Sequence, residues 1–166
     1  MHTHRIHSLT AGAAALALGL IVAGCQPARP MTKADYVARA KAAVTEISPE
    51  QAHKALREHP DIFLMDVSLW VEYRKAHLAG AALVPRGLLE FKIDNNDLFP
   101  PVNRGRAPRK DQPILVYCKL GSRSLLAART LKEMGYRDVR SIAGGLQAWV
   151  AAGLPVEKDT GAAASP

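Results

Sequence analysis

The chain has 166 residues and a formal net charge of +7, with 48% hydrophobic and 22% charged residues. This length and composition fit one globular domain with terminal extensions, and they exclude a wholly disordered chain. Two cysteines are too few for a disulfide scaffold or a cysteine-built zinc site. Aromatic residues, at 5%, offer little for stacking nucleic-acid bases, so we expect no nucleic-acid partner and a solvated, dispersed positive charge.

Residues 1–24 are predicted to be a cleaved signal peptide. Arg5 precedes an uncharged apolar run over residues 11–23, which is shorter than the roughly 20 residues of a membrane-spanning helix. The run ends in Val22-Ala23-Gly24-Cys25, which resembles the lipobox of bacterial lipoproteins. The resemblance implies that Cys25 is lipidated and becomes the new N-terminus, and that its acyl chains anchor the protein to a membrane.

Gln26 follows the lipidated cysteine, where inner-membrane lipoproteins of Gram-negative bacteria typically carry an aspartate. We therefore expect a lipid-anchored protein on the periplasmic face of the cell envelope, with the outer membrane favoured. Residues 25–43 are expected to comprise the lipidated cysteine, a tether and a lead-in helix over 31–43. Residues 157–166 are expected to be a disordered tail.

Residues 44–156 are predicted to form an α/β domain, because short apolar runs alternate with helical patterns. Ser48, Pro49 and Gln51 indicate a helix start, with Ser48 as N-cap, Pro49 in the first helical position and Gln51 completing a capping box. The fold class is a central, mainly parallel sheet with helices on both faces, and ligands bind such sheets at the carboxyl ends of the strands. Strands are expected at 44–47, 62–65, 82–85, 114–117 and 139–142. Further helices are expected over 69–76, from the residue after Arg123 to Met134, and over 144–152.

Cys118 directly follows the predicted strand 114–117, at such a carboxyl end. The helix start after it offers unpaired backbone N–H groups and the positive end of a dipole. Gly121 lets the loop adopt positive φ, while Lys119 and Arg123 add positive charge. These features favour a reactive thiolate at Cys118 over an inert cysteine that merely caps a core strand.

Three motifs in this order resemble the rhodanese family of sulfurtransferases, so residues 44–156 are identified as a rhodanese-like domain. The first comprises Leu64-Met65-Asp66-Val67, Glu72-Tyr73 and His77-Leu78-Ala79-Gly80-Ala81. The second is the active-site loop Tyr117-Cys118-Lys119-Leu120-Gly121-Ser122-Arg123-Ser124. The third comprises Ala143-Gly144-Gly145-Leu146-Gln147-Ala148-Trp149 and Ala152-Gly153-Leu154-Pro155-Val156.

The resemblance implies that Cys118 takes the outer sulfur of a small anionic donor such as thiosulfate. The sulfur is held as a covalent persulfide until a thiol, cyanide or protein acceptor removes it. The loop that binds substrate and persulfide comprises Lys119, Leu120, Gly121, Ser122 and Arg123, and the two cations are expected to orient the donor. Asp66 and His77 are expected in supporting roles. No metal or organic cofactor is expected, because no pair of histidines has metal-ligand spacing together with a carboxylate partner.

Some features depart from the family pattern and leave alternatives open. Ser68 and Ala76 stand where rhodaneses often have arginine and glycine, and residues 86–112 match the family poorly, so that this stretch could cover the pocket. A domain that carries sulfur or binds a partner without turnover is one alternative. A cysteine phosphatase is another, but it needs five residues between cysteine and arginine, whereas four separate Cys118 from Arg123.

Overall fold

The computed structural model describes residues 29–95 and 106–158 of the chain. The chain divides into two units, residues 1–30 and 31–166, and the second contains all the helices and strands named below. The predicted signal peptide, Cys25 and most of the predicted tail lie outside the described residues. Within those residues, no helix is long and apolar enough to cross a membrane.

A five-stranded sheet forms the centre of the domain, with every pair of neighbouring strands parallel. The strand order is β1-β5-β4-β2-β3, which places β4 in the middle with all four of its residues buried. The strands are β1 Thr45–Ile47, β2 Phe63–Asp66, β3 Ala82–Leu83, β4 Ile114–Tyr117 and β5 Val139–Ile142. The predicted parallel α/β sheet is confirmed; β4 and β5 have the predicted bounds, and the other strands differ by one or two residues.

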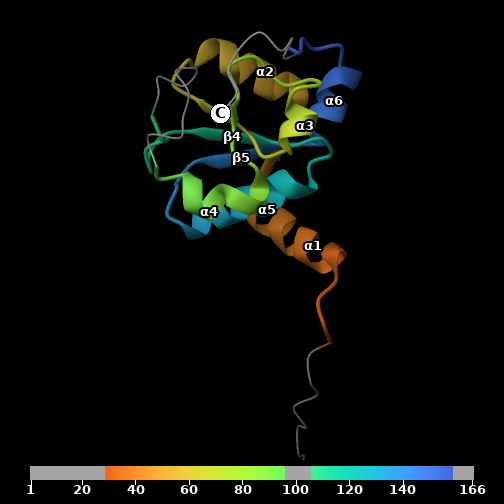
Figure 1. Cartoon of the computed structure of the whole chain (residues 1–166), viewed down its shortest axis with the longest axis vertical. Coiled ribbons are helices and arrows are strands. Elements are labelled where there is room, and N and C mark those ends of the chain that lie inside the picture. Colours follow the sequence, from red (N-terminus) through yellow and green to blue (C-terminus); the bar gives the residue numbers. More distant parts are fainter. Residues whose placement is uncertain (1–28, 96–105, 159–166) are drawn as a thin grey trace, which may run out of the picture. The chain divides into compact units, whose positions relative to one another are not determined.

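Helices cover both faces of the sheet (Figure 1), as the predicted fold class requires. The helices are α1 Lys33–Ala43, α2 Pro49–Glu58, α3 Trp70–Tyr73, α4 Leu89–Lys92, α5 Ser122–Glu133 and α6 Gly145–Ala151, with a 3-10 turn η1 at Arg86–Leu88. One core layer packs α1, α4 and α5 against side chains such as Met65 and Val116. The other packs α2 and α6 against Leu64 and Leu115, so alternate strand residues serve opposite faces.

The start of α2 is the predicted capping box. Gln51 N donates to Ser48 Oγ at 3.2 Å, and Ser48 N donates to Gln51 Oε1 at 2.9 Å. Pro49 occupies the first helical position, where a backbone N–H has no partner within the helix, so proline costs no hydrogen bond there. This start fixes the direction in which the chain leaves β1.

The described part of residues 86–112 is more ordered than the sequence indicated. It forms η1 and α4, and both Leu89, the first residue of α4, and Ile93, just after it, are fully buried in the core layer shared with α5. Arg86 binds Glu90 at 2.9 Å and donates to Thr130 of α5 at 3.0 Å. Residues 86–93 therefore belong to the packed domain, while residues 96–105 lie outside the description.

Candidate active site

Cys118 is held at the carboxyl end of the central strand, immediately before α5. Its Sγ atom accepts a hydrogen bond from the backbone N–H of Gly121 at 3.2 Å, and the residue is fully buried. Gly121 is the N-cap of α5 and has φ +91°, a conformation that side-chain-bearing residues rarely adopt. The loop therefore curls around the sulfur and directs a backbone donor at it, which favours negative charge there.

The carbonyl groups of the same loop turn the other way, toward α6. Leu146 N donates to Cys118 O at 2.8 Å, and Gln147 N donates to Lys119 O at 3.0 Å. Gly145, with φ +61°, lies so close that an added Cβ would collide with Cys118 O. Gly144 and Gly145 of the third motif thus let α6 approach the loop and hold its carbonyl oxygens on the side of α6.

Two buried serines fix the first turn of α5. Ser124 Oγ donates to Gly121 O at 2.8 Å, and Ser141 Oγ of β5 donates to Ser124 Oγ at 2.9 Å. Both serines are fully buried, so water does not compete for either hydrogen bond. No sequence motif singles out Ser141, whose only signal is a hydroxyl between Arg140 and Ile142 in β5.

Arg123 does not point freely into the loop but forms a two-pronged ion pair with Glu72 of α3. Its Nη1 lies 2.6 Å from Glu72 Oε2 and its Nη2 lies 2.9 Å from Glu72 Oε1. These bonds are the main cause of a raised pKa of Arg123, to which Cys118 also contributes, and of a lowered pKa of Glu72. Glu72 belongs to the first motif, from which no role for it follows; the structure brings it to Arg123 from 51 positions away in the sequence.

Comparison with known proteins decides the family. The model of the rhodanese-like domain matches residues 48–152. The chain belongs to the rhodanese-like domain family. A sulfurtransferase of Allochromatium vinosum is 29% identical over 113 residues, covering 68% of this chain and 94% of that protein. Thiosulfate sulfurtransferase 18 of Arabidopsis thaliana is 32% identical over 103 residues, covering 57% and 71%.

Solved structures give the same fold. The polysulfide-sulfur transferase homodimer of Wolinella succinogenes has a TM-score of 0.58 at 30% identity, covering 76% of this chain and 87% of that chain. A protein of unknown function from Rhodopseudomonas palustris, described as a possible tyrosine phosphatase, has a TM-score of 0.65 at 27% identity, covering 81% and 100%. The predicted rhodanese-like domain is confirmed, and its relatives support a sulfurtransferase activity in general.

Asp66 of the rhodanese-like domain lies at the end of β2, beside β4. Its Oδ1 accepts a hydrogen bond from Ser68 N at 2.7 Å, which shapes the turn that leads into α3. Burial is the main cause of a raised pKa of Asp66. Tyr117 is its neighbour in the strand register; burial raises the pKa of Tyr117, and its hydroxyl accepts a hydrogen bond from Leu78 N at 2.9 Å.

His77 makes its contacts away from the Cys118 loop. Its ring stacks on Tyr73 with 3.8 Å between ring centroids, and its Nδ1 lies 3.0 Å from Tyr73 O. Its Nε2 lies 3.7 Å from Glu157 Oε2, and the two backbones form an antiparallel bridge. The structure therefore places His77 where it ties α3 to the chain that follows α6.

A shallow cavity of about 560 Å³ opens beside the loop, lined by Lys119, Leu120, Leu146, Gln147 and Val150. Lys119 and Leu120 are both exposed, whereas Ser122 and Arg123 are half-buried and Gly121 is buried. The pKa of Glu72 is lowered mainly by its bonds to Arg123, and the charge of Lys119 contributes in the same direction. The loop residues predicted from sequence thus lie together, with Arg123 committed to Glu72 and Lys119 facing solvent.

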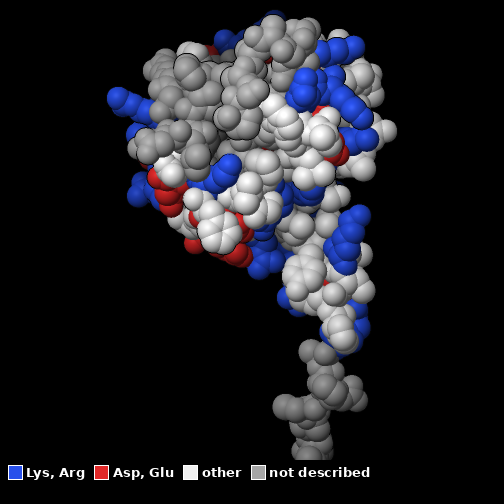
Figure 2. Space-filling model, viewed as in Figure 1, with Lys and Arg blue, Asp and Glu red and all other residues white. Residues whose placement is uncertain are grey.

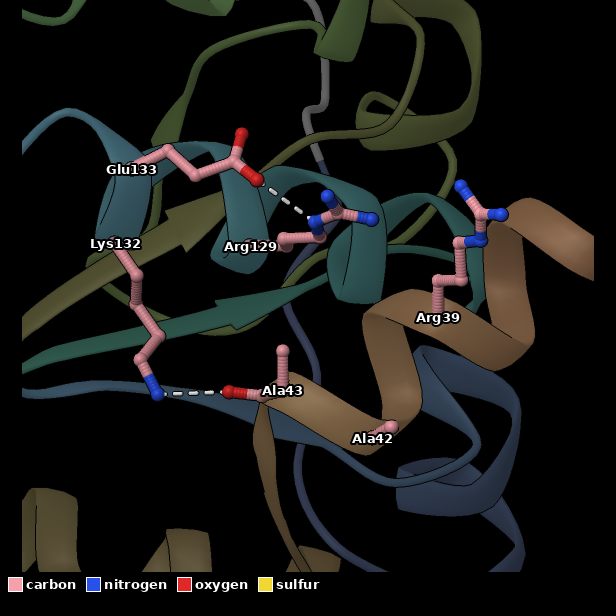
Figure 3. Close-up of a pocket in the computed structure, with 6 residues that line it drawn as sticks. All are labelled: Arg39, Ala42, Ala43, Arg129, Lys132 and Glu133. Atoms are coloured by element: carbon pink, nitrogen blue, oxygen red, sulfur yellow. Dashed lines mark hydrogen bonds and ion pairs between the residues drawn. The ribbon is translucent and has the colours of Figure 1, made fainter.

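A second groove lies between α1 and α5, with a volume of about 530 Å³ (Figure 3). It lies toward the end of α5 farther from Cys118 and contains no cysteine. Its charged groups are largely paired, because Arg129 binds Glu133 at 2.8 Å and Lys132 donates to Ala43 O at 2.7 Å. Its chemistry therefore differs from that of the Cys118 loop.

Proposed function

We propose that this protein is a sulfurtransferase that moves a sulfane sulfur through a persulfide on Cys118. The observation that carries the proposal is the bond from Gly121 N to Cys118 Sγ, in a loop whose carbonyl oxygens are tied to α6. Such a loop favours an anionic sulfur, which is required of both the thiolate nucleophile and the persulfide.

In the first half-reaction, the Cys118 thiolate attacks the outer sulfur of an anionic donor such as thiosulfate. The bond between the two donor sulfurs breaks, sulfite leaves with its electron pair, and the outer sulfur remains on Cys118 as an anionic persulfide. Lys119 attracts the donor as a point charge. Arg123 contributes less than an unpaired guanidinium would, since Glu72 already holds both of its terminal nitrogens.

In the second half-reaction, an acceptor removes that sulfur. Cyanide attacks the outer sulfur and leaves as thiocyanate, or a thiolate does so and becomes a persulfide. In both cases the electron pair of the broken S–S bond returns to Cys118 Sγ, so the thiolate is regenerated without an external oxidant. Two successive half-reactions with a covalent intermediate predict ping-pong kinetics.

The deciding experiment is intact-mass analysis of the full chain after incubation with thiosulfate. We expect the mass of one added sulfur atom on the wild type and on a Cys25→Ser control, and none on Cys118→Ser. An adduct that persists in Cys118→Ser, or no adduct from either thiosulfate or polysulfide, would overturn the proposal.

A sulfur carrier without turnover is the second candidate, favoured by the full burial of Cys118. It predicts that the adduct forms but that cyanide and small thiols remove it negligibly. A phosphatase is disfavoured, because the loop is one residue shorter than such enzymes need and Arg123 is bound by Glu72. Cys118-dependent hydrolysis of an aryl phosphate would reverse that judgement.

We also propose that Cys25 anchors the protein by lipidation at the periplasmic face of the envelope, with the outer membrane favoured. The support is the sequence Val22-Ala23-Gly24-Cys25 after an uncharged apolar run. Growth with an alkyne-bearing fatty acid should label the wild-type protein and leave Cys25→Ser unlabelled. Equal labelling of the two, or recovery of both from the soluble fraction, would refute the anchor.

A further inference from the structure

The exposed large apolar side chains of the described residues gather beside the catalytic loop. Eight such side chains are at least 42% exposed, and five of them lie on the loop, on α6, or on and just before α3. These five, which we call the apolar rim, are Leu69 (56% exposed), Trp70 (46%), Val71 (61%), Leu120 (59%) and Val150 (51%). Concentrated apolar surface of this kind marks an interaction site more often than chance exposure does.

Three observations connect the apolar rim to Cys118. Leu120 is two positions after Cys118 in the loop. Val150 lines the same cavity as Leu120 and Leu146, and Leu146 N holds the Cys118 carbonyl. Glu72 joins α3 to the first turn of α5 through its ion pair with Arg123. The apolar rim is therefore connected to the loop through both α6 and α3.

Small substrates do not account for this surface. Cys118 is fully buried within its loop, so only a slender group can approach its sulfur. Thiosulfate and cyanide are slender and charged, and neither gains from apolar side chains that are about half exposed. A cysteine carried on a protein segment would reach the sulfur with its thiol while flanking residues cover the apolar rim.

The charges around the apolar rim are mainly positive. Lys75 and Lys119 are exposed, whereas the carboxylate of Glu72 is neutralised by Arg123. Figure 2 shows Lys and Arg side chains gathered over the part of the surface where α3 lies in Figure 1. A segment that is complementary to this surface combines apolar with acidic residues.

We propose that the apolar rim is the docking surface for an acidic, apolar segment of a partner protein that carries the acceptor cysteine. The inference rests on the proposed sulfur transfer through Cys118 and names the acceptor of that reaction. The partner thiol loses its proton to solvent, and its thiolate attacks the outer sulfur of the Cys118 persulfide. The new S–S bond lies on the partner, and the electron pair of the broken bond returns to Cys118 Sγ.

The test uses the full chain, loaded with sulfur, and three short peptides that each carry one central cysteine. The first has leucines beside the cysteine and glutamates outside them; the second replaces the leucines with serines, and the third replaces the glutamates with lysines. We expect kcat/KM for the first peptide to exceed that of the second roughly tenfold, because apolar side chains leave water, and that of the third roughly threefold. Equal values for the three peptides would overturn the inference.

Variants locate the surface. We expect Val71→Ser and Val150→Ser together to lower the ratio of kcat/KM for the first peptide to kcat/KM for cyanide roughly fivefold. Phe91→Ser is the matched control, because Phe91 is 82% exposed but belongs to α4 in the other helix layer, and it should leave that ratio unchanged. An equal fall in the control would refute docking at the apolar rim. Failure of the loaded protein to pass sulfur to cyanide or to any peptide would instead refute the proposed function.

Discussion

Substitution of Gly145 by alanine is the most direct test of how the Cys118 loop is held. Gly145 has φ +61° and supports the loop from the start of α6. An added Cβ would collide with Cys118 O and lie 2.9 Å from Gly121 N, the atom that donates to the sulfur. The start of α6 and the Cys118 loop cannot both keep their positions, so one of them must move.

The loss of stability in Gly145→Ala has two sources, the backbone conformation at residue 145 and the contacts of the added Cβ. Left-handed φ costs an alanine about 1–2 kcal/mol, and overpacking against backbone atoms adds about 1–3 kcal/mol. Moving α6 away also weakens the 2.8 Å bond from Leu146 N to Cys118 O, worth about 0.5–1.5 kcal/mol. We therefore expect Gly145→Ala to lower the free energy of unfolding by about 3–6 kcal/mol.

Gly153→Ala is the matched control, because Gly153 has a similar φ of +70° and nothing within 4 Å of an added Cβ. It should cost only the backbone part, about 1–2 kcal/mol. Urea unfolding of both variants measures the difference, and the rate of sulfur loading onto Cys118 measures the loop. Loading should slow at least roughly tenfold in Gly145→Ala, because a shift of about 1 Å at a reacting centre is already costly.

The reasoning fails if both variants lose the same stability. It also fails if Gly145→Ala is destabilised as expected but loads sulfur at the wild-type rate. In that second case the approach of α6 would matter for folding and not for the position of Gly121 N.

Three further substitutions test the groups around the loop. Ser124→Ala should destabilise the domain by about 1–3 kcal/mol in urea unfolding, because Ser141 Oγ is left buried without its acceptor. The lowered pKa of Glu72 means that its ion pair stabilises the domain above the ordinary carboxyl pKa and that this stability is lost as pH falls through the lowered value. Between pH 3 and pH 7, the free energy of unfolding of Glu72→Gln should therefore fall less with decreasing pH than that of the wild type. The same pH dependence in both proteins would contradict the pairing. The raised pKa of Asp66 has the opposite sign: wild-type stability should fall relative to Asp66→Asn as pH rises from about 4 through the raised value.

The position of Cys118 and the geometry of its immediate loop were predictable from sequence because they rest on local rules. A β-rich apolar run, a cysteine, a glycine and a helix start follow one another without a gap, and each has a local structural preference. The same holds for the start of α2, where Ser48, Pro49 and Gln51 satisfy one another within a single turn. Such short-range signals fixed the positions of β4 and the Cys118 loop to the residue.

Contacts between distant segments were not predictable in this way. The pairing of Arg123 with Glu72 joins residues 51 positions apart, so the sequence offered Arg123 as a donor-binding group without showing the carboxylate that it binds. Gly145 showed a turn signal, but its approach to Cys118 O depends on how β5 packs beside β4. The helical turn at α4 is only four residues long, and it is stabilised by burial of Leu89 and Ile93, which no local pattern reveals.

The bridge between His77 and Glu157 marks where a reporter can be fused to this protein. The two residues exchange backbone hydrogen bonds of 2.9 and 2.8 Å, and just before them Trp149 Nε1 donates to Pro155 O at 2.8 Å. A fusion inserted ahead of Pro155 would break both connections and uncover Trp149, which is 3% exposed. A fluorescent protein joined after Lys158 leaves them intact, so the location of the protein can be followed in living cells without disturbing the domain.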